Sequence, residues 1–535
     1  MSSNQLSNIA LSGPCDVCGK DGRPCARCRL NYYCGKEHQK VHWPVHKLGC
    51  GVVEIRGDLL AASKNIPAGT VVLRELPTLR YPGQNEQFKL LCVECGVDMS
   101  HLNPPPQCSK CGLPACGRQC SESWDHQAEC REFQRAKYKV PVAALATKFL
   151  FPRAVAILRT TLAIPDNPLL QHLQRKLGSL NTPFKAAMNI ECNFVLQYLR
   201  RTVGVRLSEA DLRMGALITS LYSADMQGVT GRTQISQTYF SGLYVGMSLR
   251  KHSCFPNTGE KLLSPETYEY VVVTTRDVVA GEHLTDPVRF CEWYDETLQR
   301  RRVVAGQWGL DCDCVRCRDP TELGMYVGSP CCANCSGNGK KCLVVPDDDK
   351  HRRWSCTGCG AQMTVAQVEA VSQGARNRLE QLMQKDSSPD SLLSFVAEQL
   401  YPRGPLHPTH AVVLRAREYI RESFKRRGRA NQRDMERWEE VTRAQLQALD
   451  RLMPGTNRHR VTTLVELRWL VLSRLRTAEK NLASQHSEDL VRYVTTWKDG
   501  VRELNKAIGD VLFSKRDKDS LAKDPFGDFI LNKRV

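Results

Sequence analysis

The first fifty residues contain eight cysteine and histidine residues in four close pairs, and this spacing constrains the fold more than any other feature. Thiolate and imidazole groups bind zinc tetrahedrally at about 2.0–2.3 Å, so four pairs supply the ligands of two sites. Metal-like spacing disfavours the alternative, a small disulfide framework. The segment therefore predicts two interleaved zinc sites. The pairs are Cys15 and Cys18, Cys25 and Cys28, Cys34 and His38, and His46 and Cys50.

The composition is typical of a globular, multi-domain chain. Its 535 residues are more than a single hydrophobic core usually organises, so several domains are expected. A hydrophobic content of 41% supports folded cores of ordinary size. The most apolar region, 140–158, is interrupted by Lys148, Pro152 and Arg153, and no secretory leader opens the sequence, so neither membrane spanning nor export is expected. The 25 cysteines lie mostly in close pairs, which indicates reduced, zinc-bound thiols in the cytoplasm and nucleus.

The chain carries a formal net charge of +18, which is compatible with acidic partners or nucleic acid. The densest basic stretch, 421–433, has six basic residues and fits either a nuclear import signal or a solvated helix end and loop. No segment has the ββα pattern of base-reading zinc fingers, so direct nucleic-acid binding is disfavoured.

Further cysteine groups follow along the chain. Four more pairs around a proline-rich loop, 101–107, repeat the first pattern and predict a second finger. A three-cysteine group at 312–317 lacks one ligand for a closed tetrahedral site. Two later C-x-x-C motifs have the spacing of a zinc ribbon, with Cys331 and Cys342 as alternative ligands. The candidate ligands are Cys92, Cys95, Cys108, Cys111, Cys116, Cys120, His126, Cys130, Cys312, Cys314, Cys317, Cys332, Cys335, Cys356 and Cys359.

Strands and helices alternate in blocks around these groups. Short β-branched runs within 57–79 predict two strands and a turn, and strands return near 267–282. Residues 131–240 show helical spacing, and the lone Cys192 within them is interpreted as a buried structural thiol. From about residue 363 the spacing is helical again, and an apolar seam at 490–511 predicts core packing between antiparallel helices.

The segment YCGKEHQKVHWPVHKLGC, residues 33–50, resembles the MYND zinc finger. The resemblance implies that pairs one and three bind one ion and pairs two and four the other, with His42 as an alternative to His38. It also implies an exposed groove for short proline-containing peptides, lined by Gln39 and Trp43, with packing between the zinc ions as the alternative role of Trp43. The implied sites are Cys15, Cys18, Cys34 and His38, and Cys25, Cys28, His46 and Cys50.

The segment GLYVGMSLRKHSCFPNT, residues 242–258, is similar to the strand-and-knot motif of SET-domain protein methyltransferases. Residues 57–77 resemble the opening strands of that domain, and 274–285 resemble its later strands. DCDCVRCRDPTELG, 311–324, resembles its post-SET zinc loop. The resemblance implies that Cys254 is the fourth ligand of the site formed by Cys312, Cys314 and Cys317.

A SET domain split by a MYND finger and followed by TPR-like helices is the layout of the SMYD family. An additional finger before the SET strands resembles the arthropod branch of that family. We therefore expect an α+β multidomain fold with zinc-rich MYND fingers, a split β-rich SET domain and an all-α C-terminal domain. The expected ranges are 1–50 MYND finger, 51–91 first SET strands, 92–130 second MYND-like finger, 131–240 helical SET insertion, 241–300 C-terminal SET core, 301–362 post-SET zinc loop and zinc ribbon, and 363–535 TPR-like helices.

The resemblance implies S-adenosylmethionine as cofactor and a lysine amine as acceptor, held in line with the methyl–sulfur bond. A tyrosine hydroxyl lines the transfer site in the family. Counting from Leu284 places Val288 at that position, and counting back from Arg300 places Phe290 there, so both alignments lack the hydroxyl. Tyr294 is the nearest phenol and the candidate catalytic residue if the strand is re-registered.

Several positions that contact the cofactor in the family are substituted here. Lys251 stands where the family has asparagine, and two like charges about 4 Å apart repel by about 4 kcal/mol at an effective dielectric of about 20. That repulsion weakens cofactor binding unless the lysine turns toward the cofactor carboxylate or into water. Gly57 is followed by Asp58 instead of arginine. The expected cofactor-binding residues are Gly57, Ser220, Lys251, His252 and Leu310.

Two functions of different class follow from these features. The first is a zinc-dependent protein-interaction scaffold or transcriptional regulator with a degenerate methyltransferase site. The second is an active protein-lysine N-methyltransferase that acts on histone or other lysines. The scaffold is favoured because function resides in the site and not in the fold. By ligand count, we expect about six zinc ions in either case.

Overall fold

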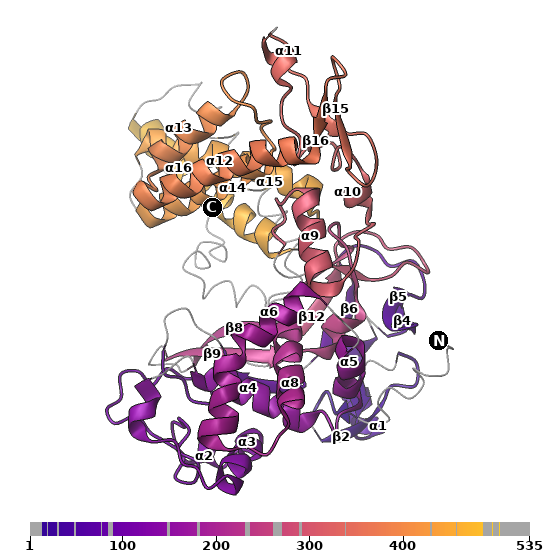
Figure 1. The fold of residues 1–535 in the computed structure, drawn as a ribbon, viewed down its shortest axis with the longest axis vertical. Helices are drawn as coiled ribbons and strands as arrows, with labels where there is room; N and C mark the ends of the chain where they lie inside the picture. The colour runs from indigo at the N-terminus through magenta and orange to yellow at the C-terminus, as the bar shows by residue number, and fades with distance from the viewer. Residues whose placement is uncertain are drawn as a thin grey trace.

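The computed structural model describes residues 13–484 with short gaps, and beyond them only Thr495 and Arg502. Helix α9, Thr297–Trp308, lies between two lobes (Figure 1). One lobe carries the finger segments and most of the paired strands, and the other carries the zinc-ribbon segment and the last helices. The gaps are 19, 29–30, 48–49, 76, 84–88, 147–149, 179–181, 231–235, 261–269, 288–290, 338, 428–430 and 456.

Strands from distant parts of the chain pair in the first lobe. The two strands expected within 57–79 form as β5, Leu59–Ala62, and β6, Val71–Glu75, which confirms that prediction. β5 pairs in a hairpin with β4, Val53–Arg56, and β6 pairs antiparallel with β12, Tyr270–Thr274. β11, Thr258–Glu260, extends the latter sheet beyond β12. The core that these strands enclose includes Leu60, Val72, Leu73, Tyr244, Tyr270 and Val272.

Two very short parallel strands lie close to the expected cofactor residues. β10, Lys251–His252, pairs with β13, Thr285–Asp286, and the Lys251 amide donates to the Leu284 carbonyl at 2.9 Å. The fully buried Asn257 stabilises this crossing, because its Oδ1 accepts from the Thr285 amide at 2.7 Å. The pairing therefore fixes residues 251 and 252 beside the strand that leads to residues 288–290.

The helices expected within 131–240 form but end earlier than predicted. Residues 223–243 instead form the antiparallel strands β8, Ser223–Thr230, and β9, Ser236–Leu243, and β9 also pairs with β7, Leu79–Pro82. The helical prediction was wrong there because Val229 and Thr230 are β-branched and the neighbouring strand β7 supplies backbone partners. The helices of this region are the end of α3, Trp124–Arg135, and α4 Leu150–Ala163, α5 Pro168–Gly178, α6 Pro183–Glu191, α7 Asn193–Gln197 and α8 Glu209–Tyr222, and α2, Arg118–Ser121, precedes them.

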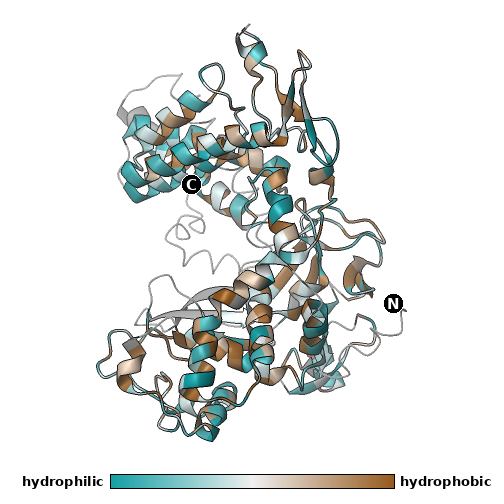
Figure 2. Ribbon diagram, in the orientation of Figure 1, coloured by the Kyte–Doolittle hydropathy of each residue, from teal (hydrophilic) through white to brown (hydrophobic). Residues whose placement is uncertain are grey.

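Helix α4 lies at the centre of the first lobe and is buried along most of its length. Gly215 allows α8 to cross it closely, because a Cβ at this position would lie 2.3 Å from Thr161 Oγ1 and 2.9 Å from the Ile157 carbonyl. Figure 2 shows apolar residues along both helices. Cys192 is 6% exposed in the same core, which confirms that it is a buried thiol.

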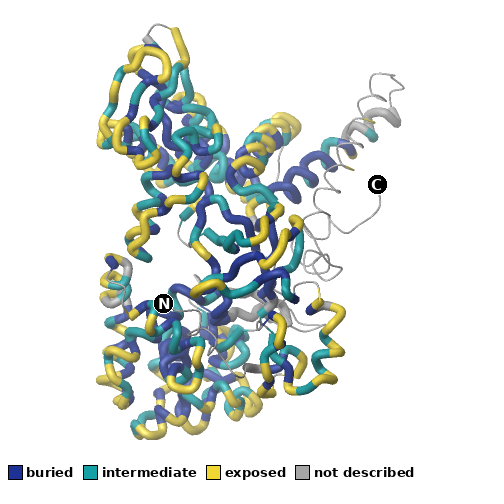
Figure 3. Tube along the Cα trace, turned by 90° about the vertical axis from the view of Figure 1, so that its right-hand side faces the viewer, coloured by how far each residue is buried: buried dark blue, intermediate teal, exposed yellow. Residues whose placement is uncertain are grey.

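The C-terminal region is helical after residue 363, as the spacing predicts. Leu464, Leu467, Val471 and Leu475 are buried on one helix, and Figure 3 shows buried positions through the interior of both lobes. The apolar seam at 490–511 lies outside the described residues. The helices are α12 Val365–Lys385, α13 Pro389–Gln399, α14 Ala411–Arg427, α15 Gln432–Leu452 and α16 Arg458–Ser484.

The basic stretch at 421–433 contributes partly to the core of these helices. Arg421 and Lys425 bind the carboxylate of the buried Glu466 at 2.7 and 2.9 Å. Trp438 Nε1 donates to the same carboxylate at 2.6 Å. These two cations are therefore structural, which favours the helix-end interpretation over a free import signal. Within the described residues, no helix is long and apolar enough to cross a membrane.

Candidate functional site

The first finger brings its eight predicted ligands into two groups of four. In one group, His38 Nδ1 lies 3.5 Å from Cys15 Sγ and 3.1 Å from Cys34 Sγ. In the other, His46 Nε2 lies 3.2 Å from Cys28 Sγ. Ligand atoms around a single tetrahedral ion have this spacing, because each lies about 2.0–2.3 Å from the metal. The groups are Cys15, Cys18, Cys34 and His38, and Cys25, Cys28, His46 and Cys50, and in each all ligand atoms lie within 4.8 Å of one another.

Helix α1, Lys36–His46, carries the three histidines of this finger, and each of them has different neighbours. The Tyr33 hydroxyl lies 2.5 Å from His46 Nδ1, so this nitrogen is engaged by the phenol while Nε2 faces the thiols. His42, the alternative ligand, instead lies 2.9 Å from the Tyr33 hydroxyl through its Nδ1. The structure therefore places His38 among the thiols and His42 beside Tyr33.

The second finger also brings its candidate ligands into two groups. Cys116 Sγ lies 3.4 Å from the sulfur atoms of both Cys95 and Cys120. In the other group, His126 Nε2 lies 3.6 Å from Cys111 Sγ. This second group is fully buried, whereas the first group is partly exposed. The groups are Cys92, Cys95, Cys116 and Cys120, and Cys108, Cys111, His126 and Cys130.

A buried carboxylate connects the second finger to the central helix α4. His126 Nδ1 lies 3.0 Å from Glu129 Oε1, and the Arg159 guanidinium donates to both oxygens of that carboxylate at 2.6 and 3.0 Å. Desolvation opposes the ionised form, but Arg159 and His126 together hold the pKa of Glu129 below its usual range. A carboxylate behind a ligand histidine fixes the ring tautomer and strengthens the ligand. Zinc binding in this finger is thereby linked to the lobe core.

The remaining cysteine groups are formed by Cys254 with the segment after α9, and by the ribbon segment. Cys254 Sγ lies 3.9 Å from Cys312 Sγ and 3.6 Å from Cys317 Sγ, so residues far apart in the sequence meet in one group. In the ribbon segment, a three-stranded sheet of β14 Val344–Pro346, β15 Arg353–Cys356 and β16 Gln362–Thr364 supports two pairs. The pairs are Cys332 with Cys359 at 3.7 Å and Cys335 with Cys356 at 3.6 Å between sulfur atoms.

Lys251 points away from the protein interior. Its side chain is 50% exposed, and its ammonium lies 3.9 Å from the carboxylate of Asp313. Exposed charges are strongly screened, so the repulsion between Lys251 and a sulfonium is weaker than the sequence alone predicts. His252 is less exposed, and its Nε2 lies 3.4 Å from Cys254 Sγ. Burial lowers the pKa of His252, which favours a neutral ring.

The other expected cofactor residues lie on three separate elements. Gly57 is exposed in the turn between β4 and β5, with a left-handed φ of +62°. Ser220 is half-buried near the end of α8. Leu310 is 51% exposed, and it follows Gly309, which ends helix α9. The structure thus places Lys251 and His252 side by side on one strand, whereas Gly57, Ser220 and Leu310 lie on other elements.

Tyr294 lies among apolar residues that join the two lobes. Its ring is 5.3 Å from that of Trp293, and both pack with Val327 against helices α14 and α15. Burial, together with the charge of Glu292, raises the pKa of its hydroxyl. Val288 and Phe290, the two positions aligned with the family tyrosine, lie outside the described residues.

Comparison with known proteins supplies the relatives of this chain. Residues 15–50 match the family described as the MYND finger. The chain is 25% identical over 362 residues to SET domain-containing protein SmydA-8, isoform B, of Drosophila melanogaster, covering 65% of the chain and 74% of the relative. The chain is a relative of the SET- and MYND-domain proteins.

Two further relatives support the same recognition. Mus musculus histone-lysine N-methyltransferase SMYD3 is 24% identical over 287 residues, which cover 51% of the chain and 62% of the relative. Danio rerio protein-lysine N-methyltransferase SMYD4 is 23% identical over 421 residues, which cover 69% of the chain and 50% of the relative. The recognition predicted from the zinc pairs and the SLRKHSC segment is confirmed.

The cysteine-rich groups have the donor set of zinc. Thiolate and imidazole ligands in closed groups of four match the preference of Zn²⁺ for tetrahedral sulfur and nitrogen coordination. We expect elemental analysis of the purified protein to give about six zinc ions per chain: two per finger, one with Cys254 and one in the ribbon. A content of about four or fewer would show that at least one group does not hold an ion.

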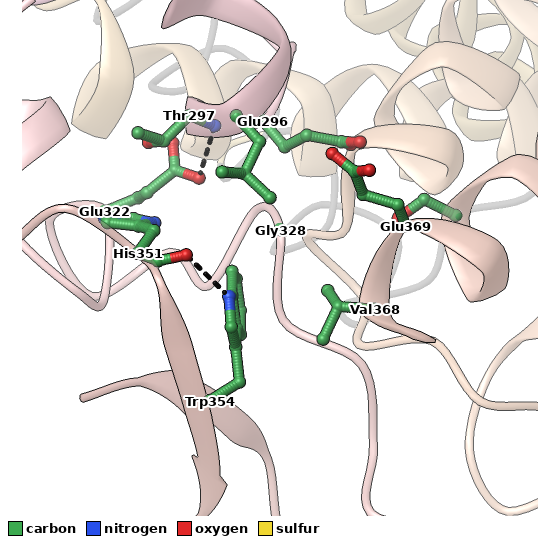
Figure 4. Close-up of a pocket in the computed structure, with 10 residues that line it drawn as sticks. Glu296, Thr297, Glu322, Gly328, His351, Trp354, Val368 and Glu369 are labelled. Atoms are coloured by element: carbon green, nitrogen blue, oxygen red, sulfur yellow. Dashed lines mark hydrogen bonds between the residues drawn. The ribbon is translucent and has the colours of Figure 1, made fainter. Parts of the chain in front are cut away.

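A small pocket beside the ribbon was not predicted from the sequence. It is lined by segments around Glu296 and His351 and by helix α12, and Figure 4 shows Trp354 Nε1 donating to the His351 carbonyl at 3.1 Å. Burial lowers the pKa of His351 to about 4, so the ring is neutral. None of the expected cofactor residues lines this pocket. No sequence signal predicts this pocket, because its lining residues share no motif or spacing.

Proposed function

We propose that this chain is a zinc-dependent protein-interaction scaffold or transcriptional regulator whose methyltransferase site is degenerate. The observation that carries the proposal is the position of Tyr294. This phenol is partly buried and packs with Trp293 and Val327 against α14 and α15, so its ring serves the packing of that cluster. A phenol committed to that cluster cannot replace the hydroxyl that both alignments of the transfer position lack.

The proposal assigns a split SET domain to the paired strands of the first lobe. The sheet of β6, β12 and β11 joins residues 51–91 with 241–300, as a SET domain interrupted by a finger requires. The post-SET group is completed by Cys254. Residues 363–535 are assigned as the TPR-like domain, which is supported by the described helices α12 to α16. Residence in the cytoplasm and nucleus is part of the same proposal.

An active protein-lysine methyltransferase is the second candidate, and one observation favours it. Lys251 faces water and Asp313, so its charge repels a bound cofactor less strongly than the sequence alone indicates. The residues that would hold S-adenosylmethionine are Gly57, Ser220, Lys251, His252 and Leu310, and the cofactor would supply the methyl group. The names of the relatives from mouse and zebrafish point to lysine methylation.

MYND fingers mediate protein interactions, and the first finger carries the surface for this role. Trp43 and Val41 on helix α1 are 43% and 69% exposed, which is unusual for large apolar side chains. Gln39 is half-buried, and its Nε2 lies 3.9 Å from Cys25 Sγ. The partner proposed for this surface is a short proline-containing peptide, because an extended proline-rich chain packs well on an aromatic face.

The proposed partner surface is tested with single alanine variants. Trp43→Ala and Gln39→Ala should each weaken peptide binding about 5- to 30-fold, the range of an interface anchor, without loss of zinc. Trp124→Ala on the second finger is the matched control, because Trp124 is 81% exposed. Calorimetry that shows the same weakening for the control, or loss of zinc in either variant, would count against the surface.

A further inference from the structure

Arg250 is a buried cation held by polar groups from three strands. Its side chain is fully buried, and its guanidinium lies 2.9 Å from the carboxylate of Asp286 on β13. It also donates to the Tyr270 hydroxyl on β12 at 2.5 Å and to Thr258 Oγ1 on β11 at 3.3 Å. A cation removed from water is stable only when it is paired and hydrogen-bonded in this way.

An aromatic ring also lies against this guanidinium, because Arg250 Cζ is 5.6 Å from the centroid of the Tyr270 ring. Tyr244 and Tyr270 are both fully buried, and their ring centroids are 5.1 Å apart. A carboxylate, a phenol and tyrosine rings together are the groups that bind an alkylammonium or guanidinium ion in protein interiors. The groups around Arg250 therefore form a cation-binding site, and the guanidinium of Arg250 itself occupies this site.

The site lies where β10 and β13 of the proposed SET domain pair. β10 carries expected cofactor residues and is called the cofactor strand, and β13 leads to the expected transfer position and is called the transfer strand. Arg250 directly precedes Lys251 and His252 on β10, the residues expected at the cofactor. Asp286 ends β13 and is two residues before Val288, one of the two candidates for the transfer position. The carboxylate that holds Arg250 is thus the start of the segment that leads to the expected transfer site.

We propose that Arg250 occupies, as an internal cation, the place where an acceptor lysine amine would have to lie. The chain then binds its own guanidinium between the cofactor strand and the transfer strand, and a substrate lysine is excluded even when cofactor is bound. A guanidinium paired with Asp286 and Tyr270 does not leave the site without leaving the partly buried carboxylate of Asp286 unpaired. This inference rests on the proposed descent of the site from a methyltransferase, and it names the acceptor side as the blocked one.

The site is tested by removing its occupant and offering a replacement. Arg250→Ala leaves Asp286 and Tyr270 facing a space that fits a small cation. Millimolar n-butylammonium, which matches the end of a lysine side chain, should raise the melting temperature of this variant saturably by about 2–4 °C. Potassium at equal ionic strength should not. Absence of a saturable shift would overturn the proposal.

A second buried arginine provides the matched control. Arg421 is buried with Glu466 in the helical lobe at 2.7 Å, and Lys425 keeps that carboxylate paired at 2.9 Å, so Arg421→Ala creates a buried hole without an unpaired carboxylate and with no proposed path for a lysine. The proposal requires that n-butylammonium stabilises Arg250→Ala and leaves Arg421→Ala unchanged. Equal stabilisation of both variants would show only that any arginine-shaped hole takes a cation, and would overturn the inference.

The unmodified protein gives a test that does not depend on how a variant folds. Because Arg250 fills the site, n-butylammonium should produce no saturable shift in its melting temperature, and no lysine peptide should accept a methyl group from S-adenosylmethionine. Saturable stabilisation or methyl transfer would contradict the proposal. Peptide binding at the first finger is measured separately, so failure of the scaffold function and failure of this inference are distinguishable.

Discussion

Replacement of Cys111 by serine in the second finger is expected to unfold the first lobe. Cys108, Cys111 and Cys130 belong to the same hydrophobic cluster as helices α4 and α8. A structural zinc ion contributes about 10–16 kcal/mol, which is as large as the net stability of a typical domain, about 5–15 kcal/mol. Loss of this ion should therefore remove the cooperative melting transition, measured by circular dichroism together with zinc content.

The first finger provides the comparison. Among the described residues, its second group packs in a small buried cluster of Cys25, Cys28, Tyr33 and Cys50. Cys28→Ser should release zinc from this finger and abolish its peptide binding, while the main melting transition shifts only slightly. A similar loss of the main transition in Cys111→Ser and Cys28→Ser would mean that both fingers are packed equally into the core of the first lobe. That result would contradict the packing described above.

Glu322→Gln is expected to destabilise the protein by about 3–5 kcal/mol, because it leaves two buried arginines without a counter-charge. The Glu322 carboxylate lies 2.7 Å from Arg300 and 3.2 Å from Arg316, and all three side chains are almost fully buried. Glu369→Gln is the control, because Glu369 pairs with Arg302, which is 59% exposed, and such pairs contribute about 0–1 kcal/mol. Equal shifts in melting temperature for Glu322→Gln and Glu369→Gln would refute the larger contribution expected of the buried carboxylate.

The same carboxylate predicts the direction of acid sensitivity. Burial raises the pKa of Glu322, but Arg300 and Arg316 outweigh it and hold the pKa below its usual range. A group with a depressed folded pKa contributes stability that is present above the unfolded value, about 4.3 for glutamate, and is lost as pH falls through the folded pKa. In Glu322→Gln this contribution should be absent, so its melting temperature should change less than that of the unmodified protein below about pH 4.

Local spacing predicted the zinc groups because their ligands are close in sequence and share one chemical role. Cys254 could be assigned to Cys312, Cys314 and Cys317 only through the SET resemblance, since no local pattern links residues so far apart. The strands at 223–243 were missed because β9 pairs with the distant strand β7, a tertiary effect that overrides short apolar spacing.

Side-chain direction was the least predictable property of the site. The sequence shows that Lys251 replaces an asparagine, but whether it faces a cofactor or water depends on the pairing of β10 with β13. Nothing in the sequence distinguishes Arg250, one residue earlier, although it is the cation that points inward. Its partners Asp286 and Tyr270 lie on other strands, so their meeting requires the folded sheet.

A titration with S-adenosylmethionine followed by methyl transfer tests the central claim most directly. We expect weak or undetectable cofactor binding by calorimetry and no transfer of labelled methyl to histone or peptide lysines. Lys251→Asn should improve cofactor binding only modestly, because Lys251 already faces water, and should not restore transfer. Micromolar cofactor affinity in the unmodified protein, with label transferred to a lysine and lost on Tyr294→Phe, would contradict the account and make Tyr294 the catalytic phenol.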